Sequence, residues 1–436
     1  MRRTGLAVLA LLALFGCGGA AHDTRTTIRF WGMGREGEVV SDLARDFERE
    51  NPDVHVIVQG IPWTAAHAKL LTAHVGRSLP DCFQLGNTWV AEFTALHAID
   101  PLTPWLAASR AIDTHDQFPG VWDTNVMGGV VYGVPWYVDT RVLFYRRDLL
   151  ARAGYDSIPQ SWVEWRRAME AVKRVVGKDR YAILLPANEW TQPVIFGLQN
   201  GATLLADHDT RADFEDPAFE QAFAFFLGLF RDGLAPPVTN NEIANVYQEF
   251  ERGTFAMYIT GPWNVGEFRN RLAPEHQSAW TTSPLPGPRG AASGISLAGG
   301  SSLVLSRAGE HKQAAWRFIE YLCRPEVQAR FTHLTGDLPA RPSVWADTAI
   351  TKEPALAAFK TQLERVVSTP KLPEWEEIAN RLQDQAEGPI RGKVPADSAL
   401  ARLDRDVNAM LEKRRWLLEH GKLLVERPAE ARMAQR

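Results

Sequence analysis

Apolar residues along the chain fall into short runs typical of strands, separated by longer stretches with the spacing of helices. Residues 27–31 alternate between apolar and polar like a strand, and residues 39–47 place apolar side chains on one helical face. A second strand is predicted at 54–58, a second helix at 65–75 and a third strand at 81–85. This order of strands and helices predicts a parallel sheet that is covered by helices.

The alternation of strands and helices begins again after Pro135. Ser161 and Glu164 have the spacing of a capping box at a helix start, and Asp216 is expected to cap a helix that begins at Pro217. On one face of that second helix lie four aromatic side chains, which are predicted to pack in the hydrophobic core: Phe219, Phe223, Phe226 and Phe230. Apolar runs predict further strands at 143–145, 181–185, 255–259 and 303–305.

The size of the chain favours two lobes. Its 436 residues and 48.7 kDa exceed what one typical core holds. From Pro342 onward the pattern is mostly helical and includes a final amphipathic helix over residues 400–411. The net charge of −4 argues against a nucleic-acid partner. The 15 tryptophans suggest that some flat apolar faces are kept for a ligand, while others fill the core.

Cysteine occurs three times, and the first copy lies in an export signal. Met1-Arg2-Arg3 precedes an apolar run from Leu6 to Phe15, which is too short to span a bilayer. The sequence up to Cys17 resembles a bacterial lipoprotein signal, so we expect a signal peptide at 1–16 and a lipidated tether at 17–27. An ordinary secretory signal is the alternative, and both place the mature protein outside the cytoplasm.

The other two cysteines, Cys82 and Cys323, are expected to be small buried hydrophobes, although a disulfide between them is permitted in an oxidising compartment. No second long apolar run follows the signal, so contact with the membrane is expected only through the lipid on Cys17.

The sequence contains no complete motif of a common catalytic site. The sequence holds no HExxH, P-loop or CxxC pattern, and the segment 294–298 approaches a nucleophile elbow but lacks its last glycine. The 11 histidines are scattered, so neither a metal nor a cofactor is expected. Carboxylate runs such as 374–377 are typical of solvated helix faces. A glycosidase stays open, because its two carboxylates need only be close in space.

Aromatic residues recur at the ends of predicted strands, beside glycine and polar side chains. The segments that show this are 30–32, 87–89, 135–139 and 261–264. In open parallel sheets, ligands bind beyond the carboxyl ends of the strands. A pyranose has apolar faces that cover an aromatic ring and hydroxyls that need hydrogen-bonding partners. These segments therefore suit a sugar.

Four segments carry a family resemblance that extends over essentially the whole mature chain: 133–145, 250–263, 299–302 with the helix that follows, and 338–341. In them the chain resembles the extracellular solute-binding proteins of bacterial ABC importers, in the branch that binds maltose, trehalose and related sugars. The resemblance implies an α/β fold of two lobes, each a mostly parallel sheet flanked by helices. The lobes would be joined by crossing hinge strands, with a helical C-terminal region.

The resemblance also implies lobe boundaries and a ligand site in the cleft between the lobes. Lobe 1 would comprise residues 28–137 and 284–339, and lobe 2 residues 138–283 and 340–436. The sugar-binding residues carried over are Arg35, Glu36, Asn87, Tyr137, Asp139, Trp190, Trp263, Gly300, Ser301, Arg341 and Trp375.

The expected roles of these residues differ. Asp139 at the hinge would accept from sugar hydroxyls, and Tyr137 and Trp263 would form part of an aromatic wall. Arg35 or Glu36 would contact hydroxyls. Asn87 would hydrogen-bond through its amide at a position where relatives often have Asp, and Gly300 and Ser301 would offer backbone N–H groups. Arg341 would donate two hydrogen bonds to one sugar. Trp190 and Trp375 would add further aromatic faces.

The function implied is the capture of a disaccharide or short oligosaccharide and its delivery to the transmembrane subunits of a permease. A monomer without cofactor or enzymatic activity is expected. The alternatives are an exported glycoside hydrolase and a receptor subunit that reports a solute to a sensor kinase. A glycerol phosphate ligand would need basic residues in the cleft motifs, where only Arg35, Arg141 and Arg341 are candidates.

If Cys17 carries the lipid, replacing it should release the protein from the membrane. We predict that Cys17→Ser moves the mature protein from the membrane fraction to the soluble extracytoplasmic fraction, with unchanged sugar affinity. Cell fractionation and immunoblotting, with the wild-type protein as control, measure this. A Cys17→Ser protein that stays with the membrane would contradict anchoring through this residue.

Overall fold

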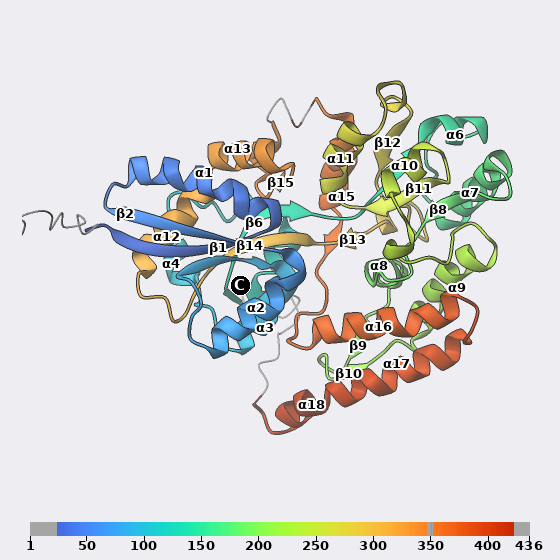
Figure 1. Cartoon of the computed structure of the whole chain (residues 1–436). Coiled ribbons are helices and arrows are strands. Elements are labelled where there is room, and N and C mark those ends of the chain that lie inside the picture. Colours follow the sequence, from blue (N-terminus) through green and yellow to red (C-terminus); the bar gives the residue numbers. More distant parts are fainter. Residues whose placement is uncertain (1–23, 347–349, 351, 423–436) are drawn as a thin grey trace, which may run out of the picture.

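The structure, a computed structural model, consists of two α/β lobes that are joined by crossing strands (Figure 1). It describes residues 24–346, 350 and 352–422. The predicted signal peptide and Cys17 lie outside these residues. The first strand begins at Thr26, within the last two residues of the predicted tether, whose bounds stay a prediction.

The first lobe is built on a six-stranded sheet with the order β15-β6-β14-β3-β1-β2. Its strands are β1 (Thr26–Met33), β2 (Val54–Ile61), β3 (Cys82–Gly86), β6 (Val134–Asp139), β14 (Gly299–Leu305) and β15 (Leu338–Pro339). β1 pairs in parallel with β2 and β3, which confirms the strand-helix-strand pattern read at the start of the chain.

The second lobe is built on a four-stranded sheet with the order β12-β7-β11-β8. Its strands are β7 (Val142–Arg146), β8 (Tyr181–Leu184), β11 (Phe255–Thr260) and β12 (Trp280–Ser283). β11 pairs in parallel with β8 and antiparallel with β7. Short two-stranded pairs complete the strands: β4 (Val126–Met127) with β5 (Val130–Val131), β9 (Leu205–Ala206) with β10 (Arg211–Ala212), and β13 (Ser296–Leu297) with β16 (Val366–Val367).

Both sheets are mixed, so the expectation of mostly parallel sheets is wrong in this detail. β14 runs antiparallel to both β3 and β6, and β15 runs antiparallel to β6. The reason is the crossing of the chain between the lobes. β6 leaves the first sheet and β7 enters the second only two residues later, whereas β14 returns to the first sheet in the opposite direction.

The lobe boundaries given above stay a prediction. β6 ends at Asp139, two residues beyond the boundary expected after 137. Among the described residues, no helix is long and apolar enough to cross a membrane.

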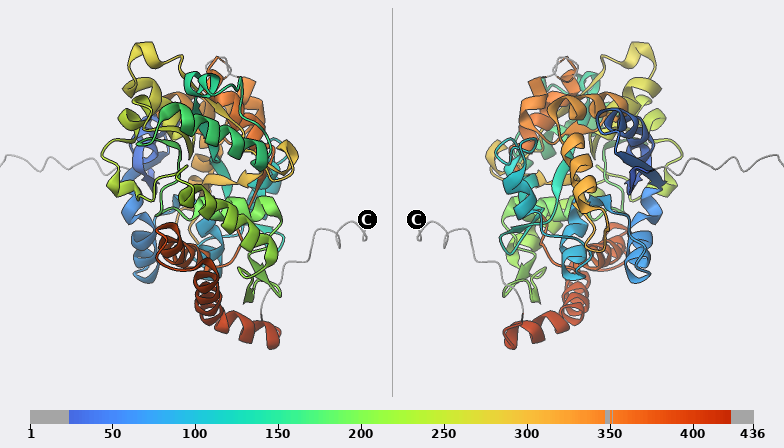
Figure 2. Two further views of the ribbon diagram at one scale, coloured as in Figure 1. Left: turned by 90° about the vertical axis from the view of Figure 1, so that its right-hand side faces the viewer. Right: turned by 90° about the vertical axis from the view of Figure 1, so that its left-hand side faces the viewer.

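Helices cover both sheets. Those around the first sheet are α1 (Gly34–Glu50), α2 (Trp63–Val75), α3 (Val90–Ala95), α4 (Thr103–Ala108), α5 (Pro119–Asp123), α12 (Lys312–Leu322) and α13 (Pro325–Thr335). Those around the second are α6 (Arg147–Arg152), α7 (Trp162–Val176), α8 (Thr191–Asn200), α9 (Pro217–Arg231), α10 (Val246–Glu251), α11 (Trp263–Arg271) and α15 (Ala357–Leu363). The C-terminal region adds α16 (Trp375–Ile390), α17 (Ala396–Met410) and α18 (Glu412–Glu419), which lie along one side of the molecule (Figure 2).

Local signals in the sequence place two of the helix starts. The Ser161 hydroxyl accepts from the backbone N–H of Glu164 at 3.3 Å, and the Asp216 carboxylate accepts from Ala218 and Phe219. Both contacts satisfy N–H groups that have no partner within the helix. The two predicted helix starts are therefore confirmed.

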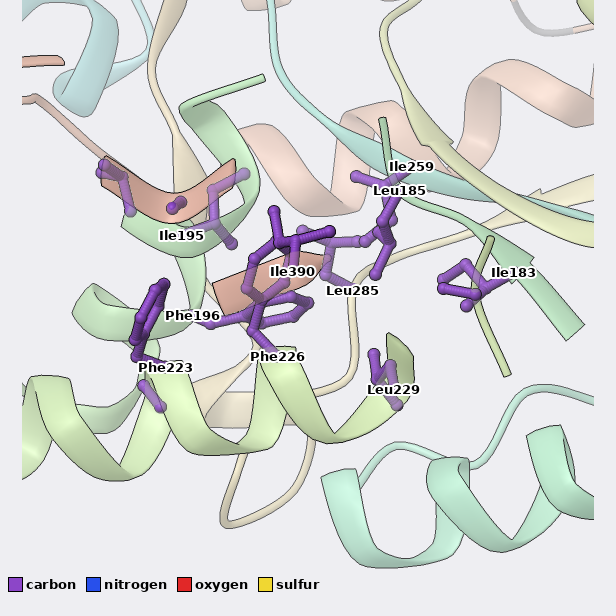
Figure 3. Close-up of a cluster of buried hydrophobic side chains, with 14 of the residues drawn as sticks. Ile183, Leu185, Ile195, Phe196, Phe223, Phe226, Leu229, Ile259, Leu285 and Ile390 are labelled. Carbon is purple, nitrogen blue, oxygen red and sulfur yellow. The ribbon is translucent and has the colours of Figure 1, made fainter. Parts of the chain in front are cut away.

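The aromatic stripe of α9 forms the centre of the second lobe's core (Figure 3). Phe226 packs against Phe196 of α8, with ring centroids 6.1 Å apart, and Ile390 at the end of α16 closes the cluster. Cys82 and Cys323 are buried in the first lobe as free thiols, as expected of small hydrophobes. The core prediction for α9 is confirmed.

We predict that Phe226→Ala lowers the free energy of unfolding by about 3–5 kcal/mol, because the cluster cannot collapse around the lost ring. Urea denaturation measures the change. Val163→Ala on α7, where the side chain is 59% exposed, is the control and should change it by less than about 0.5 kcal/mol. A loss below about 1 kcal/mol for Phe226→Ala would contradict this packing.

Candidate functional site

A cleft of about 730 Å³ lies between the two lobes, at the carboxyl ends of β3 and β6. The first lobe contributes residues that follow these strands and the N-terminal turns of α1 and α2. The second lobe contributes the N-terminal turns of α8, α11 and α16. The cleft thus occupies the position at which open α/β sheets bind ligands.

Aromatic rings line the cleft from both lobes. Trp63 and Trp89 of the first lobe meet edge to face, with ring centroids 5.9 Å apart. Tyr137, Trp190 and Trp263 complete the aromatic lining. Trp263 is 43% exposed, an unusual state for so large an apolar side chain. These faces are available to cover the apolar face of a ligand.

The turn that presents Trp263 depends on Gly261. A Cβ atom at this position would lie 2.0 Å from the Trp263 ring, closer than two non-bonded atoms can approach. β11 therefore ends in a glycine, and the ring of Trp263 folds back over it at the start of α11.

Arg141 connects Asp139 to this ring. Its guanidinium lies 3.0 Å from Asp139 Oδ1 and 4.7 Å from the Trp263 ring centroid, so it forms an ion pair and a cation–π contact together. Burial raises the pKa of Asp139, and the nearby Arg141 opposes this rise. The hinge between β6 and β7 therefore holds a carboxylate, a cation and an aromatic face in one row.

Two glycines of β14 let the backbone approach this row. A Cβ atom at Gly299 would lie 2.0 Å from Asp139 Oδ1, and one at Gly300 would lie 2.3 Å from the carbonyl oxygen of Tyr137. Gly300 also has a φ of +118°, which strains other residues. The cleft floor is consequently made of bare backbone beside an acidic side chain.

Carboxylates outnumber basic groups in the cleft lining. Five acidic side chains line it: Glu36, Asp139, Glu267, Asp337 and Glu376. Two basic side chains, Arg35 and Arg141, also line it, and both form ion pairs, with Glu38 at 2.9 Å and Asp139 at 3.0 Å. The charge of the cleft lining therefore favours a neutral ligand that donates hydrogen bonds over an anionic ligand.

Two of these acids lie in the interior end of the cleft. Burial raises the pKa of Glu36, and the hydroxyl of Tyr137, which donates to Glu36 Oε1 at 2.7 Å, opposes this rise. Burial and the negative charge of Glu36 raise the pKa of Asp337 to about 8. At neutral pH this end of the cleft thus combines an acceptor with a carboxyl group that retains a proton.

Polar contacts join the lobes at the opposite wall. The hydroxyl of Thr88, in the 3₁₀ turn η1 (Asn87–Trp89), donates to Glu376 Oε1 of α16 at 2.6 Å. The neighbouring Asn87 side-chain amide donates to the carbonyl of Ala298 at 2.8 Å, which leaves its carboxamide oxygen as an acceptor. The first lobe therefore contacts both the second lobe and a crossing segment here.

The structure brings most of the sequence-predicted ligand residues together in this cleft. Those that line it are Arg35, Glu36, Asn87, Tyr137, Asp139, Trp190, Trp263 and Gly300. Ser301, Arg341 and Trp375 are not among the lining residues.

These three residues point elsewhere for identifiable reasons. Arg341 is 8% exposed and donates to Asp116 at 2.7 Å and to the carbonyl of Cys323 at 3.2 Å. Trp375 is buried behind Trp190, with ring centroids 5.8 Å apart. Ser301, expected to offer its backbone N–H, is buried where β14 pairs with Tyr137 of β6, and its hydroxyl donates to Tyr137. These three residues are therefore not part of the proposed ligand contacts.

The cleft also contains lining residues that the sequence does not single out as ligand contacts. Trp63, Glu267 and Asp337 line the cleft but lie outside the four segments that carry the family resemblance. Trp89 belongs to the strand-end segment 87–89, which the sequence already marks as suited to a sugar. Glu376 lies in the acidic run 374–377, which resembles an ordinary solvated helix face. Within the described ranges, no three His, Cys, Asp or Glu side chains are grouped so that they could hold a metal ion.

Known proteins resemble the chain over most of its length. The family model of the bacterial extracellular solute-binding proteins matches residues 34–329. The structure of the sugar-binding protein MalE from the phytopathogen Xanthomonas citri is 49% identical, with a TM-score of 0.87, and the match covers 90% of this chain and 99% of that one.

Two curated relatives are more distant. An uncharacterized lipoprotein of Streptomyces antibioticus is 29% identical over 367 residues, which are 80% of this chain and 77% of that protein. The diacetylchitobiose-binding protein DasA of Streptomyces coelicolor is 22% identical over 408 residues, 89% of this chain and 93% of that protein. Because the family model matches well over half of the sequence, the chain belongs to the bacterial extracellular solute-binding proteins.

Proposed function

We propose that this protein is the extracytoplasmic sugar-binding component of an ABC importer, and that it captures a disaccharide or short oligosaccharide of the maltose or trehalose type. The observation that carries the proposal is the composition of the cleft between the lobes. Aromatic faces from both lobes lie beside carboxylates and bare backbone in a volume of about 730 Å³. Pockets of this size are typical of small-molecule sites.

Each part of the cleft has a partner on a sugar. The rings of Trp63, Trp190 and Trp263 would cover the apolar faces of pyranose units. Glu36 and Asp139 would accept hydrogen bonds from hydroxyls, and the amide of Asn87 would do so through its oxygen. Together these contacts would need to supply about −8 kcal/mol for roughly micromolar binding.

Closure of the lobes follows from the position of the cleft. Because both lobes contribute lining residues, a sugar contacts both of them only when they approach each other. The sugar therefore favours the closed state through its differential contacts. The closed protein would then dock on the transmembrane subunits of a permease, and a lipid on Cys17 would keep it at the membrane beside them.

Thermal-shift screening of a disaccharide panel, followed by calorimetry with maltose and trehalose, tests the proposal. One of these sugars should bind with a stoichiometry of one and should be recovered unchanged. Release of free glucose from maltose or trehalose would instead identify a glycosidase. Co-purification with permease subunits would separate transport from a role limited to sensing.

We predict that Trp263→Ala raises the Kd for the bound sugar about 10-fold to 100-fold, because it removes a stacking face. The melting temperature of the free protein should change by less than about 2 °C, since the side chain is already 43% exposed. Trp416→Ala on α18, at 46% exposure, is the matched control and should leave the Kd unchanged. Equal Kd values for both variants would show that Trp263 does not contact the sugar.

We predict that phosphorylated ligands bind at least about 100-fold more weakly than the neutral sugar, because like charges brought together in a closed site cost several kcal/mol. Calorimetry with trehalose, trehalose 6-phosphate and glycerol 3-phosphate measures this preference. Tighter binding of either phosphate would contradict the assignment of a neutral ligand.

A further inference from the structure

Behind the cleft wall lies a buried chain of polar side chains that begins at Gln84. Gln84 stands in the middle of β3 and is 0% exposed. It contacts Ser301 and Tyr137, which are also buried, and Tyr137 in turn contacts Glu36 in the cleft. Gln84 itself does not line the cleft.

The orientation of the Gln84 amide is determined by its surroundings. Its oxygen must face Met33, whose backbone N–H donates at 2.7 Å, because an amide nitrogen cannot accept. The nitrogen Nε2 then donates to the Tyr137 hydroxyl at 3.3 Å and to the Ser301 hydroxyl at 3.1 Å. The amide nitrogen is therefore a donor to both hydroxyls.

This orientation determines the direction of the remaining hydrogen bonds. The Ser301 hydroxyl donates to Tyr137 at 3.1 Å, and the Tyr137 hydroxyl donates to Glu36 Oε1 at 2.7 Å. Gln84 thus begins a series of donors that passes through both hydroxyls. The series ends at Glu36 Oε1, which is its acceptor.

We propose that Gln84 is a positioning residue of the sugar site, which through Tyr137 and Ser301 keeps Glu36 as a fixed acceptor for a sugar hydroxyl. The inference rests on the proposed function, since it concerns the same cleft. Its consequence is selectivity: the sugar must present a hydroxyl donor at Glu36, and an analogue lacking that hydroxyl leaves a buried acceptor unpaired.

The position of Glu36 in α1 agrees with this role. Glu36 lies in the first turn of α1, where the N-terminal end of a helix favours a negative charge. Burial raises its pKa, and the donated bond from Tyr137 opposes the rise. The other titratable groups that interact with Glu36 are Asp337, before β15, and Tyr137, on β6, whereas Asp139 at the end of β6 acts on Asp337.

Gln84→Met tests the proposal, because methionine keeps the volume and removes both amide bonds. The Kd for maltose or trehalose, whichever the wild-type protein binds, should rise at least about 10-fold by calorimetry. Gln362→Met is the matched control. Gln362 is equally buried and bonds the backbone of Leu285 and Gly294, away from the cleft lining, so its loss should change the Kd by less than about twofold.

A double-mutant cycle separates positioning from a general structural effect. Tyr137→Phe removes the link to Glu36, so adding Gln84→Met to it should weaken binding by less than about twofold more. The pH profile gives a second readout. Wild-type affinity should fall as Glu36 becomes protonated, and in Gln84→Met this loss should occur at higher pH, because the donors that favour the carboxylate are gone.

Ser301→Ala provides a second variant if Gln84→Met does not fold. It should weaken sugar binding at least about threefold, while Ser306→Ala, at a buried serine just after the same strand, should not. The positioning role alone would be overturned if the Gln84 or Ser301 variant bound the sugar as tightly as the wild type. Additive losses of sugar affinity in the double-mutant cycle would overturn it as well. A wild-type protein that binds neither maltose nor trehalose would overturn both this inference and the proposed function.

Discussion

The arrangement of the cleft depends on one close approach, that of β14 to the end of β6. Gly299 and Gly300 allow the backbone to reach Asp139 and Tyr137 at distances that any Cβ atom would prevent. Because β6 leads out of the first sheet and β14 leads back into it, this contact places the hinge, the acidic side chain and the cleft floor at one point. Arg141 then links the same point to Trp263 in the second lobe.

Around this point, burial and hydrogen bonding divide the acidic residues into different roles. Glu36 accepts from Tyr137, Asp139 is paired with Arg141, and Glu376 accepts from Thr88 across the lobes. Asp337, with a pKa of about 8, retains a proton at neutral pH and can donate. A cleft of this kind offers both acceptors and a donor at fixed places, which suits a ligand whose polar groups are hydroxyls.

The sequence predicts what depends on local signals and near neighbours. The helix starts at Ser161 and Asp216 are confirmed, and the strand-end aromatic Trp263 does line the cleft. What escapes prediction depends on partners far away in sequence. Arg341 binds Asp116 rather than facing the cleft, and Glu376 becomes a lining residue only because α16 packs beside η1. The direction of β14 likewise follows from the crossing of the lobes, which alternating strands and helices do not reveal.

Native mass spectrometry of freshly purified mature protein, before and after addition of maltose or trehalose, tests the sugar-binding cleft most directly. The aromatic and acidic lining of the cleft predicts one molecule of an intact neutral sugar per chain. This sugar is either carried through purification or taken up from the added sugars. A protein that carries no sugar and gains no mass with maltose, trehalose or longer oligosaccharides would contradict this function.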